Sequence, residues 1–130
     1  CAEVVLPIHH CLMGKGADMA ALQVVYAHAQ ALAQCNEWLS RHLPNAQRVP
    51  VASNAEAARR AGAEPGTAAI ASRAAAEIYA LDLLAENIED EPSNTTRFLV
   101  IGRQEVGPSG RDKTSIAMGA ANRPGGLHTL

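Results

Sequence analysis

The chain has 130 residues, of which 48% are hydrophobic and 18% are charged, so it is long enough for one modest globular domain and too apolar to be disordered. The formal net charge is −2 and no long basic run is present, which argues against nucleic acid or an anionic membrane as a partner. No apolar segment approaches the ~20 residues that span a bilayer, and the chain has no secretory signal pattern.

Three cysteines, Cys1, Cys11 and Cys35, are an odd number without paired spacing, which indicates a reducing, cytoplasmic location with buried or idle thiols. His9 and His10 beside Cys11 suggest zinc ligands, but no second pair of ligands follows at a suitable spacing. We therefore expect no metal, and predict that these residues end a strand. Because the chain begins at Cys1 rather than at a methionine, we expect a fragment, a processed product or an incompletely recorded sequence.

Strand-like and helix-like segments alternate along the chain. Strands are predicted over residues 3–8, 23–27, 48–52, 67–71 and 98–101. Helices are predicted over residues 30–43, from 53 to about 62, and from 72 to beyond 85. The first helix carries an apolar stripe of Leu32, Cys35, Leu39 and Leu43, and the third carries one of Ala74, Ile78, Leu81 and Ala85. This alternation predicts an α/β fold with a mostly parallel sheet and helices on both faces.

Local signals predict where several elements begin, bend or end. Pro7 cannot donate to a strand ladder, so its strand is expected at an edge or to bend there. Asp18 is expected to cap a short helical turn. Ser53 with Glu56 three residues later matches a capping box, and Gly62 is expected to end that helix in a left-handed conformation.

Polar residues stand where predicted strands give way to helices. His28 and Gln30 lie between the carboxyl end of one strand and the amino end of the next helix, the edge at which open α/β sheets bind ligands. Backbone amides at such a helix start also favour anions. Ser53 and Ser72 hold the equivalent positions of the two later helices. Helix capping is the alternative role of these residues, and it is a complete explanation for Ser53.

The stretch from residue 87 to 102 combines a polar loop with an apolar strand. The loop, residues 90–95, is rich in turn formers, and residues 98–101 are typical of a buried strand. Arg97 offers a fixed fork of donors that suits a carboxylate, and Thr96 can both donate and accept a hydrogen bond. A site for a small acidic molecule is therefore predicted where the loop becomes the strand.

Over residues 3–103 the order of these motifs resembles the second half of a prephenate dehydratase catalytic domain. The family motif Ser-His-Pro-Gln-Ala-Leu-Ala-Gln-Cys is matched by residues 27–35, with Ala27 in place of Ser and Ala29 in place of Pro. The other matching segments, in chain order, are residues 3–10, 53–58, 68–72, 79–81 with Ala80 for the usual Gly, 88–90, Asn94 and Thr96-Arg97-Phe98. One such motif alone is weak, whereas the ordered series is specific.

The resemblance implies one lobe of a two-lobed α/β domain, similar to a periplasmic binding protein, with the active site between the lobes. Residues 1–103 would form part of that catalytic domain, and the family's opposing lobe has no counterpart in this sequence. Residues 104–112 are expected to be a linker. Residues 113–130 resemble the start of an α+β ACT regulatory domain, in which Gly125-Gly126-Leu127 stands where the family's Gly-Ala-Leu motif contributes to phenylalanine binding.

By resemblance, the activity is the conversion of prephenate to phenylpyruvate, with loss of carbon dioxide and the ring hydroxyl, in L-phenylalanine biosynthesis. The resemblance implies that Thr96 is the catalytic hydroxyl, that Arg97 orients the loop or pairs with a carboxylate, and that Phe98 packs beneath the site. The implied substrate-binding residues are Arg97, Thr95, Asn94, His28, Gln30, Ser53 and Ser72. No metal or organic cofactor is needed.

The expected partners are prephenate, L-phenylalanine as an effector, and further copies of the chain as a homodimer or larger assembly. Self-association is expected because residues 98–101 would leave an unpaired strand edge. The alternative function is a non-catalytic remnant of the family that binds a small carboxylate or has a regulatory role, since one fold supports several functions. A serine hydrolase is disfavoured because no Gly-x-Ser-x-Gly elbow is present.

Overall fold

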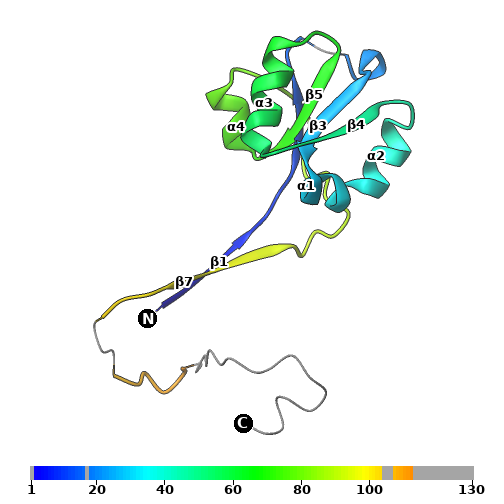
Figure 1. Ribbon diagram of the computed structural model, residues 1–130. Helices are drawn as coiled ribbons and strands as arrows, with labels where there is room; N and C mark the ends of the chain where they lie inside the picture. Colours follow the sequence, from blue (N-terminus) through cyan, green and yellow to red (C-terminus); the bar gives the residue numbers. More distant parts are fainter. Residues whose placement is uncertain (1, 17, 104–106, 113–130) are drawn as a thin grey trace, which may run out of the picture.

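The structure, a computed structural model, describes residues 2–16, 18–103 and 107–112. A five-stranded sheet carries the helices, and a two-stranded ribbon extends away from it (Figure 1). The strands are β1 (Ala2–Pro7), β2 (Cys11–Gly14), β3 (Val24–His28), β4 (Gln47–Val51), β5 (Thr67–Ala71), β6 (Asp82–Ala85) and β7 (Thr95–Val100). The helices are the 3-10 turn η1 (Met19–Ala21), α1 (Ala29–Gln34), α2 (Asn36–His42), α3 (Asn54–Ala63) and α4 (Arg73–Ile78).

The five-stranded sheet has the order β4-β3-β5-β2-β6. β3 pairs in parallel with β4 and β5, whereas β2 runs antiparallel to both β5 and β6. The predicted α/β class is correct, but the sheet is mixed because β2 runs against its neighbours. β2 was not among the predicted strands, because residues 13–18 were interpreted as a turn region, whereas β2 runs buried from Cys11 to Gly14.

Helices cover both faces of the sheet, as predicted (Figure 1). Successive strand residues face opposite sides, so Val25 and Ala27 join the cluster under α1 and α2 while Tyr26 joins the cluster under α3 and α4. The second cluster contains many alanines, which allow α3 to lie close to the strands.

A continuous helix over residues 30–43 was predicted, but the structure has two helices that break at Cys35, where φ is −115° and ψ is 18°. The carboxylate of Asp90 accepts hydrogen bonds from the backbone N–H groups of Glu37 and Trp38, at 2.9 and 3.0 Å, and thereby caps α2. Asp90 N–H also donates to the Gln34 carbonyl at 2.8 Å. Because Asp90 lies 53 residues after Glu37, the sequence around Cys35 gives no indication that α2 is capped there.

The third predicted helix is also shorter than expected, because α4 ends at Ile78 and residues 82–85 form β6. Ala80 adopts a left-handed conformation with φ at +51°, and the N–H of Leu81 donates to the Ala76 carbonyl at 2.9 Å, which closes the helix. The predicted apolar stripe is therefore wrong. Ile78 is 75% exposed, whereas Leu81 is buried beyond the helix end.

The capping predictions are partly correct. Asp18 caps η1, with its side chain accepting from the Ala20 N–H at 3.2 Å. Ser53 caps α3, with its Oγ accepting from the Glu56 N–H at 3.1 Å. The Gly62 prediction is wrong, because α3 continues to Ala63 and the positive φ, +72°, falls at Gly66.

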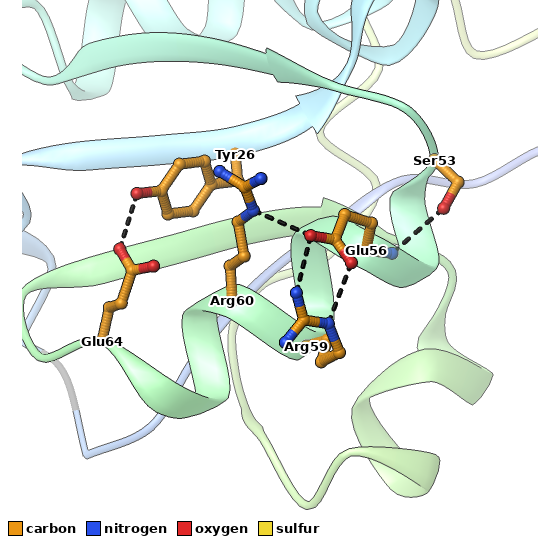
Figure 2. A network of polar contacts seen from close by, with 6 residues as sticks. All are labelled: Tyr26, Ser53, Glu56, Arg59, Arg60 and Glu64. Atoms are coloured by element: carbon orange, nitrogen blue, oxygen red, sulfur yellow. Dashed lines mark hydrogen bonds and ion pairs between the residues drawn. The ribbon is translucent and has the colours of Figure 1, made fainter.

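The outer face of α3 is held by a network of polar contacts (Figure 2). The Glu56 carboxylate accepts hydrogen bonds from Arg59 and Arg60. These bonds lower the pKa of Glu56 to about 2, and Arg59 has the larger effect. Arg60 lies over the ring of Tyr26, 5.5 Å from its centroid, and the Tyr26 hydroxyl donates to Glu64 at 2.6 Å. The network joins both ends of α3 to β3.

The ribbon is an antiparallel pair of β1 and β7, in register from Ala2 opposite Val100 to Pro7 opposite Thr95. Pro7 thus lies on an edge strand, as predicted. The expectation of a buried strand over residues 98–101 is wrong, since Phe98, Leu99 and Val100 are 51%, 58% and 51% exposed. The reason is that this apolar run pairs only with β1 among the described residues.

The segment between the ribbon and the sheet contains His9 and His10. They were predicted to end a strand together with Cys11, but they form the link from β1 to β2, and Cys11 begins β2.

In the part of the chain that the structure describes, no helix is both long enough and apolar enough to cross a membrane.

Two isoleucines offer a direct test of this core. Ile88 is fully buried in the cluster under α1 and α2, and Ile78 is 75% exposed at the end of α4. We expect Ile88→Ala to lower the free energy of unfolding by about 2–5 kcal/mol, through lost burial and the cavity left behind. The matched change Ile78→Ala should alter it by less than about 0.5 kcal/mol. Urea unfolding followed by circular dichroism measures both, and equal losses would contradict this core.

Candidate active site

A cavity of about 420 Å³ lies where the ribbon meets the carboxyl ends of β3 and β4. Its wall is built from the link before β2, the β3–α1 junction, the start of α3 and the start of β7. The lining residues are Ile8, His10, His28, Gln30, Ala31, Gln34, Ala52, Ser53, Asn54, Asn94, Thr95 and Thr96. This is the sheet edge at which the sequence predicted a ligand.

Six of the predicted site residues line this one cavity, and they come from three separate parts of the chain: His28, Gln30, Ser53, Asn94, Thr95 and Thr96. Two other predicted residues, Ser72 and Phe98, do not line it. Ser72 is the N-cap residue of α4, without a side-chain capping bond, and is exposed. Phe98, expected beneath the site, is half-exposed on the ribbon. The Gly125-Gly126-Leu127 segment lies outside the described residues.

Arg97 does not line the cavity either, although Thr96 beside it does. Neighbouring residues of a strand point to opposite faces, and the Arg97 guanidinium instead contacts the carboxylate of Glu3 on β1, with Nε and Oε1 2.7 Å apart. The predicted carboxylate partner of Arg97 is therefore supplied here by the chain itself. Arg97 joins the two strands of the ribbon rather than the cavity wall.

Two helices begin at the cavity, and hydrogen bonds join their starts. Nδ1 of His28 accepts from the N–H of Gln30 at 3.2 Å, which caps α1. The side-chain oxygen of Asn54, the first residue of α3, accepts from the backbone N–H of His28 at 2.9 Å. Helix starts carry partial positive charge, so this wall favours a negatively charged ligand.

Sequence reasoning missed three polar residues of the wall, His10, Gln34 and Asn54. His10 is 6% exposed, and its Nε2 lies 2.7 Å from the side-chain oxygen of Gln34, which places the ring hydrogen on Nε2. Gln34 shares a helix face with Gln30 and Ala31, and its spacing of four residues from Gln30 could have indicated that it lines the same site. His10 carried no local signal, because its position depends on Glu89.

Glu89 is a buried carboxylate behind the wall, with a side chain that is 2% exposed. It accepts hydrogen bonds from Nδ1–H of His9 at 2.8 Å and from the backbone N–H of His10 at 2.9 Å. Burial acts to raise the pKa of Glu89, but the bonds from His10 and His9 outweigh burial and hold the pKa below its ordinary value. Glu89 is therefore ionised at neutral pH and anchors the link before β2.

The two cysteines that the structure describes are buried and free, as the sequence predicted for idle thiols. Burial raises the pKa of Cys11, and it raises the pKa of Cys35 to about 12, with further contributions from Asp90 and Glu89. Neither thiol is a nucleophile at neutral pH. In the described part of the chain, no group of three or more His, Cys, Asp or Glu side chains could hold a metal ion.

Comparison with known protein families shows which family the chain matches. A family model described as prephenate dehydratase matches residues 1–106. Over its whole length the chain is 60% identical to a curated protein of Neisseria gonorrhoeae, named bifunctional chorismate mutase/prephenate dehydratase. The chain covers only 37% of that protein's length, so the similarity concerns one part of such a protein.

The chain is also similar to solved structures, among them the following two. A prephenate dehydratase from Arthrobacter aurescens in complex with L-Phe has a TM-score of 0.72 and 35% identity, over 87% of this chain and 37% of the other. A protein titled GqqA, described as a novel type of quorum quenching acylase, has a TM-score of 0.69 and 28% identity, over 97% of this chain and 47% of the other.

The role of Glu89 predicts a pH-dependent stability. Because its folded pKa is lowered, its contribution to stability is present above the unfolded pKa of about 4.3 and is lost as the pH falls through the folded pKa. We expect Glu89→Gln to destabilise the protein at pH 7, and the difference from wild type to shrink between pH about 5 and pH about 3.

Urea unfolding of both proteins across this pH range measures the difference. Glu77→Gln is the matched control, since Glu77 is exposed on α4, and it should change stability little at any pH. A Glu89→Gln difference that stays constant with pH would count against an ionised anchor.

Proposed function

Since this chain belongs to the prephenate dehydratase family, we propose that it supplies part of a site that converts prephenate to phenylpyruvate. The observation that carries this proposal is the meeting of Thr96, His28, Gln30 and Ser53, from three separate parts of the chain, around one cavity with two helix starts in its wall. The cavity is suited to a small carboxylate, which prephenate is.

The reaction removes carbon dioxide and the ring hydroxyl, and it is driven by the aromatic ring that forms. The protein therefore has to hold a dianion and to ease the departure of the ring hydroxyl, which leaves as hydroxide and then takes up a proton from the solvent to become water. The helix starts favour the negative charge. His28 adds a donor, because its Nδ1 accepts from Gln30 N–H and leaves Nε2 as the nitrogen that carries hydrogen.

Thr96 is the proposed catalytic hydroxyl. It is only partly exposed and lies in the cavity wall at the start of β7. A threonine hydroxyl is a poor acid in water, so we assign it a hydrogen bond to the departing ring hydroxyl that strengthens as negative charge develops there. This is electrostatic stabilisation in a preorganised wall rather than full proton transfer.

Arg97 is assigned a positioning role. Its ion pair with Glu3 joins β7 to β1, and so keeps the start of β7, with Thr96, in register with the end of β1. Both side chains are partly exposed, 62% for Arg97 and 27% for Glu3, so the pair contributes mainly to register rather than to stability.

We also propose L-phenylalanine as an effector of the full-length protein, since the similar Arthrobacter protein was solved with L-Phe. The Gly125-Gly126-Leu127 segment is the proposed contribution of this chain to that effector site. Self-association through the exposed ribbon, a cytoplasmic location, and the division into a catalytic part, linker and ACT start remain part of the proposal.

The catalytic assignment is tested with Thr96→Ala in the full-length protein. We expect kcat to fall about 10²–10³-fold, the usual cost of one donor to developing charge, while KM changes much less. Thr96→Ser keeps the hydroxyl and should retain most of the rate. The formation of phenylpyruvate, followed by its absorbance, measures both constants.

Three outcomes separate the alternatives. If kcat and substrate affinity fall to the same extent in Thr96→Ala, the assigned role of the hydroxyl is wrong. If the wild-type protein binds prephenate without forming phenylpyruvate, a non-catalytic carboxylate-binding protein is the better description. A wild-type protein that neither binds nor converts prephenate would contradict both the proposed enzyme and the non-catalytic binding protein.

A further inference from the structure

We propose that Asn54 determines which ligands the cavity accepts, by donating its side-chain N–H groups to a carboxylate of the ligand. The proposal rests on the function proposed above and adds to it a residue and a direction of hydrogen bonding. Asn54 is the first residue of α3 and lines the cavity. Sequence reasoning placed Asn54 in a segment that matches the family but did not name it as a site residue.

The orientation of the Asn54 amide follows from its one protein partner. The atom that faces the backbone N–H of His28 at 2.9 Å is the side-chain oxygen, and a backbone N–H can only donate. The amide therefore cannot be turned over without losing this bond. Its oxygen is engaged by the protein, and the polar atoms left for a ligand are the two hydrogens on Nδ2.

The neighbours of Asn54 in the wall are arranged in the same sense. Oγ of Ser53 accepts from the N–H of Glu56 at 3.1 Å, so its own hydrogen is left to donate. Nδ1 of His28 accepts from the N–H of Gln30, so the hydrogen is on Nε2. In Ser53, Asn54 and His28, the acceptor atom is therefore hydrogen-bonded to the protein backbone, and the donor hydrogen is left for a ligand in the cavity.

A wall of donors discriminates between ligands. A carboxylate can accept several hydrogen bonds at once, whereas an ammonium group has only donors and would leave the wall unpaired. A site built to pair a polar group strongly rejects a ligand that lacks it. The chemistry that fits is a small molecule with a carboxylate that keeps its charge through the reaction, as the carboxylate retained in phenylpyruvate does.

Asn54→Asp is the sharpest change. An aspartate keeps an oxygen that accepts from the His28 N–H, and its charge is favourable at the first turn of a helix, so the fold is retained. The two donors of Nδ2 are replaced by a charged acceptor that repels a carboxylate. We expect both KM for prephenate and Kd for phenylpyruvate to rise about tenfold or more, with kcat changed less than about threefold.

Asn36→Asp is the matched control. Asn36 is the first residue of α2, is exposed, and its side-chain oxygen also accepts a hydrogen bond, from Arg48. The same charge is added at the same helix position, but away from the cavity lining. KM, Kd and kcat should equal the wild-type values.

The experiment uses the full-length protein, with calorimetric titration of phenylpyruvate beside steady-state kinetics and a thermal melt. If the wild type is active and Asn54→Asp leaves KM and Kd unchanged, the inference about Asn54 is overturned while the proposed function stands. If the wild type neither converts prephenate nor binds phenylpyruvate, the proposed function has failed first.

Asn54→Ser covers the case in which Asn54→Asp melts early. The serine hydroxyl can still donate one hydrogen bond, so Kd for phenylpyruvate should rise less than in Asn54→Asp. A serine variant that melts like the wild type and binds phenylpyruvate as tightly would overturn the inference, as would one that binds it no better than Asn54→Asp does.

Discussion

The buried carboxylate of Glu89 is the contact on which the cavity depends, because it joins two segments that lie 79 residues apart in the sequence. A buried charge is costly unless hydrogen bonds satisfy it, and here both oxygens are paired, one with the His9 ring and one with the His10 backbone. The carbonyl of His10 in turn accepts from the N–H of Ile88 at 3.0 Å. These bonds fix the link before β2 against the segment that leads to β7, so that His10 and Thr96 reach the same cavity.

The residues on either side of Glu89 extend this effect into the sheet. Ile88 fills the core under α1 and α2, and Asp90 caps α2 through two backbone N–H groups. One short segment therefore anchors the ribbon link, closes the core and sets the break between α1 and α2. The break matters for the site, because Gln34 at the end of α1 then reaches His10.

The wall that results is rich in hydrogen-bond donors and lies at the start of two helices. The proposed ligand of this wall is a small carboxylate, and Thr96 lines the cavity from a different element than Asn54 does. In the proposed function, binding by Asn54 and chemistry by Thr96 therefore belong to separate elements, α3 and β7. Arg97 supports the second of these from outside the cavity, through its contact with Glu3.

The sequence by itself determined the features that depend on neighbouring residues: the α/β class, most strands, the Ser53 and Asp18 caps, and the polar residues at strand ends that line the cavity. Tertiary structure alone decided the antiparallel direction of β2, the break at Cys35 and the exposure of β7. It also decided that Arg97 pairs with Glu3 and that His10 lies in the wall. The end of α4 is set locally, by Ala80 and the hydrogen bond from Leu81 to Ala76. The other outcomes depend on a partner far away in the chain, and a strand run or helix stripe carries no information about which distant backbone or carboxylate will meet it.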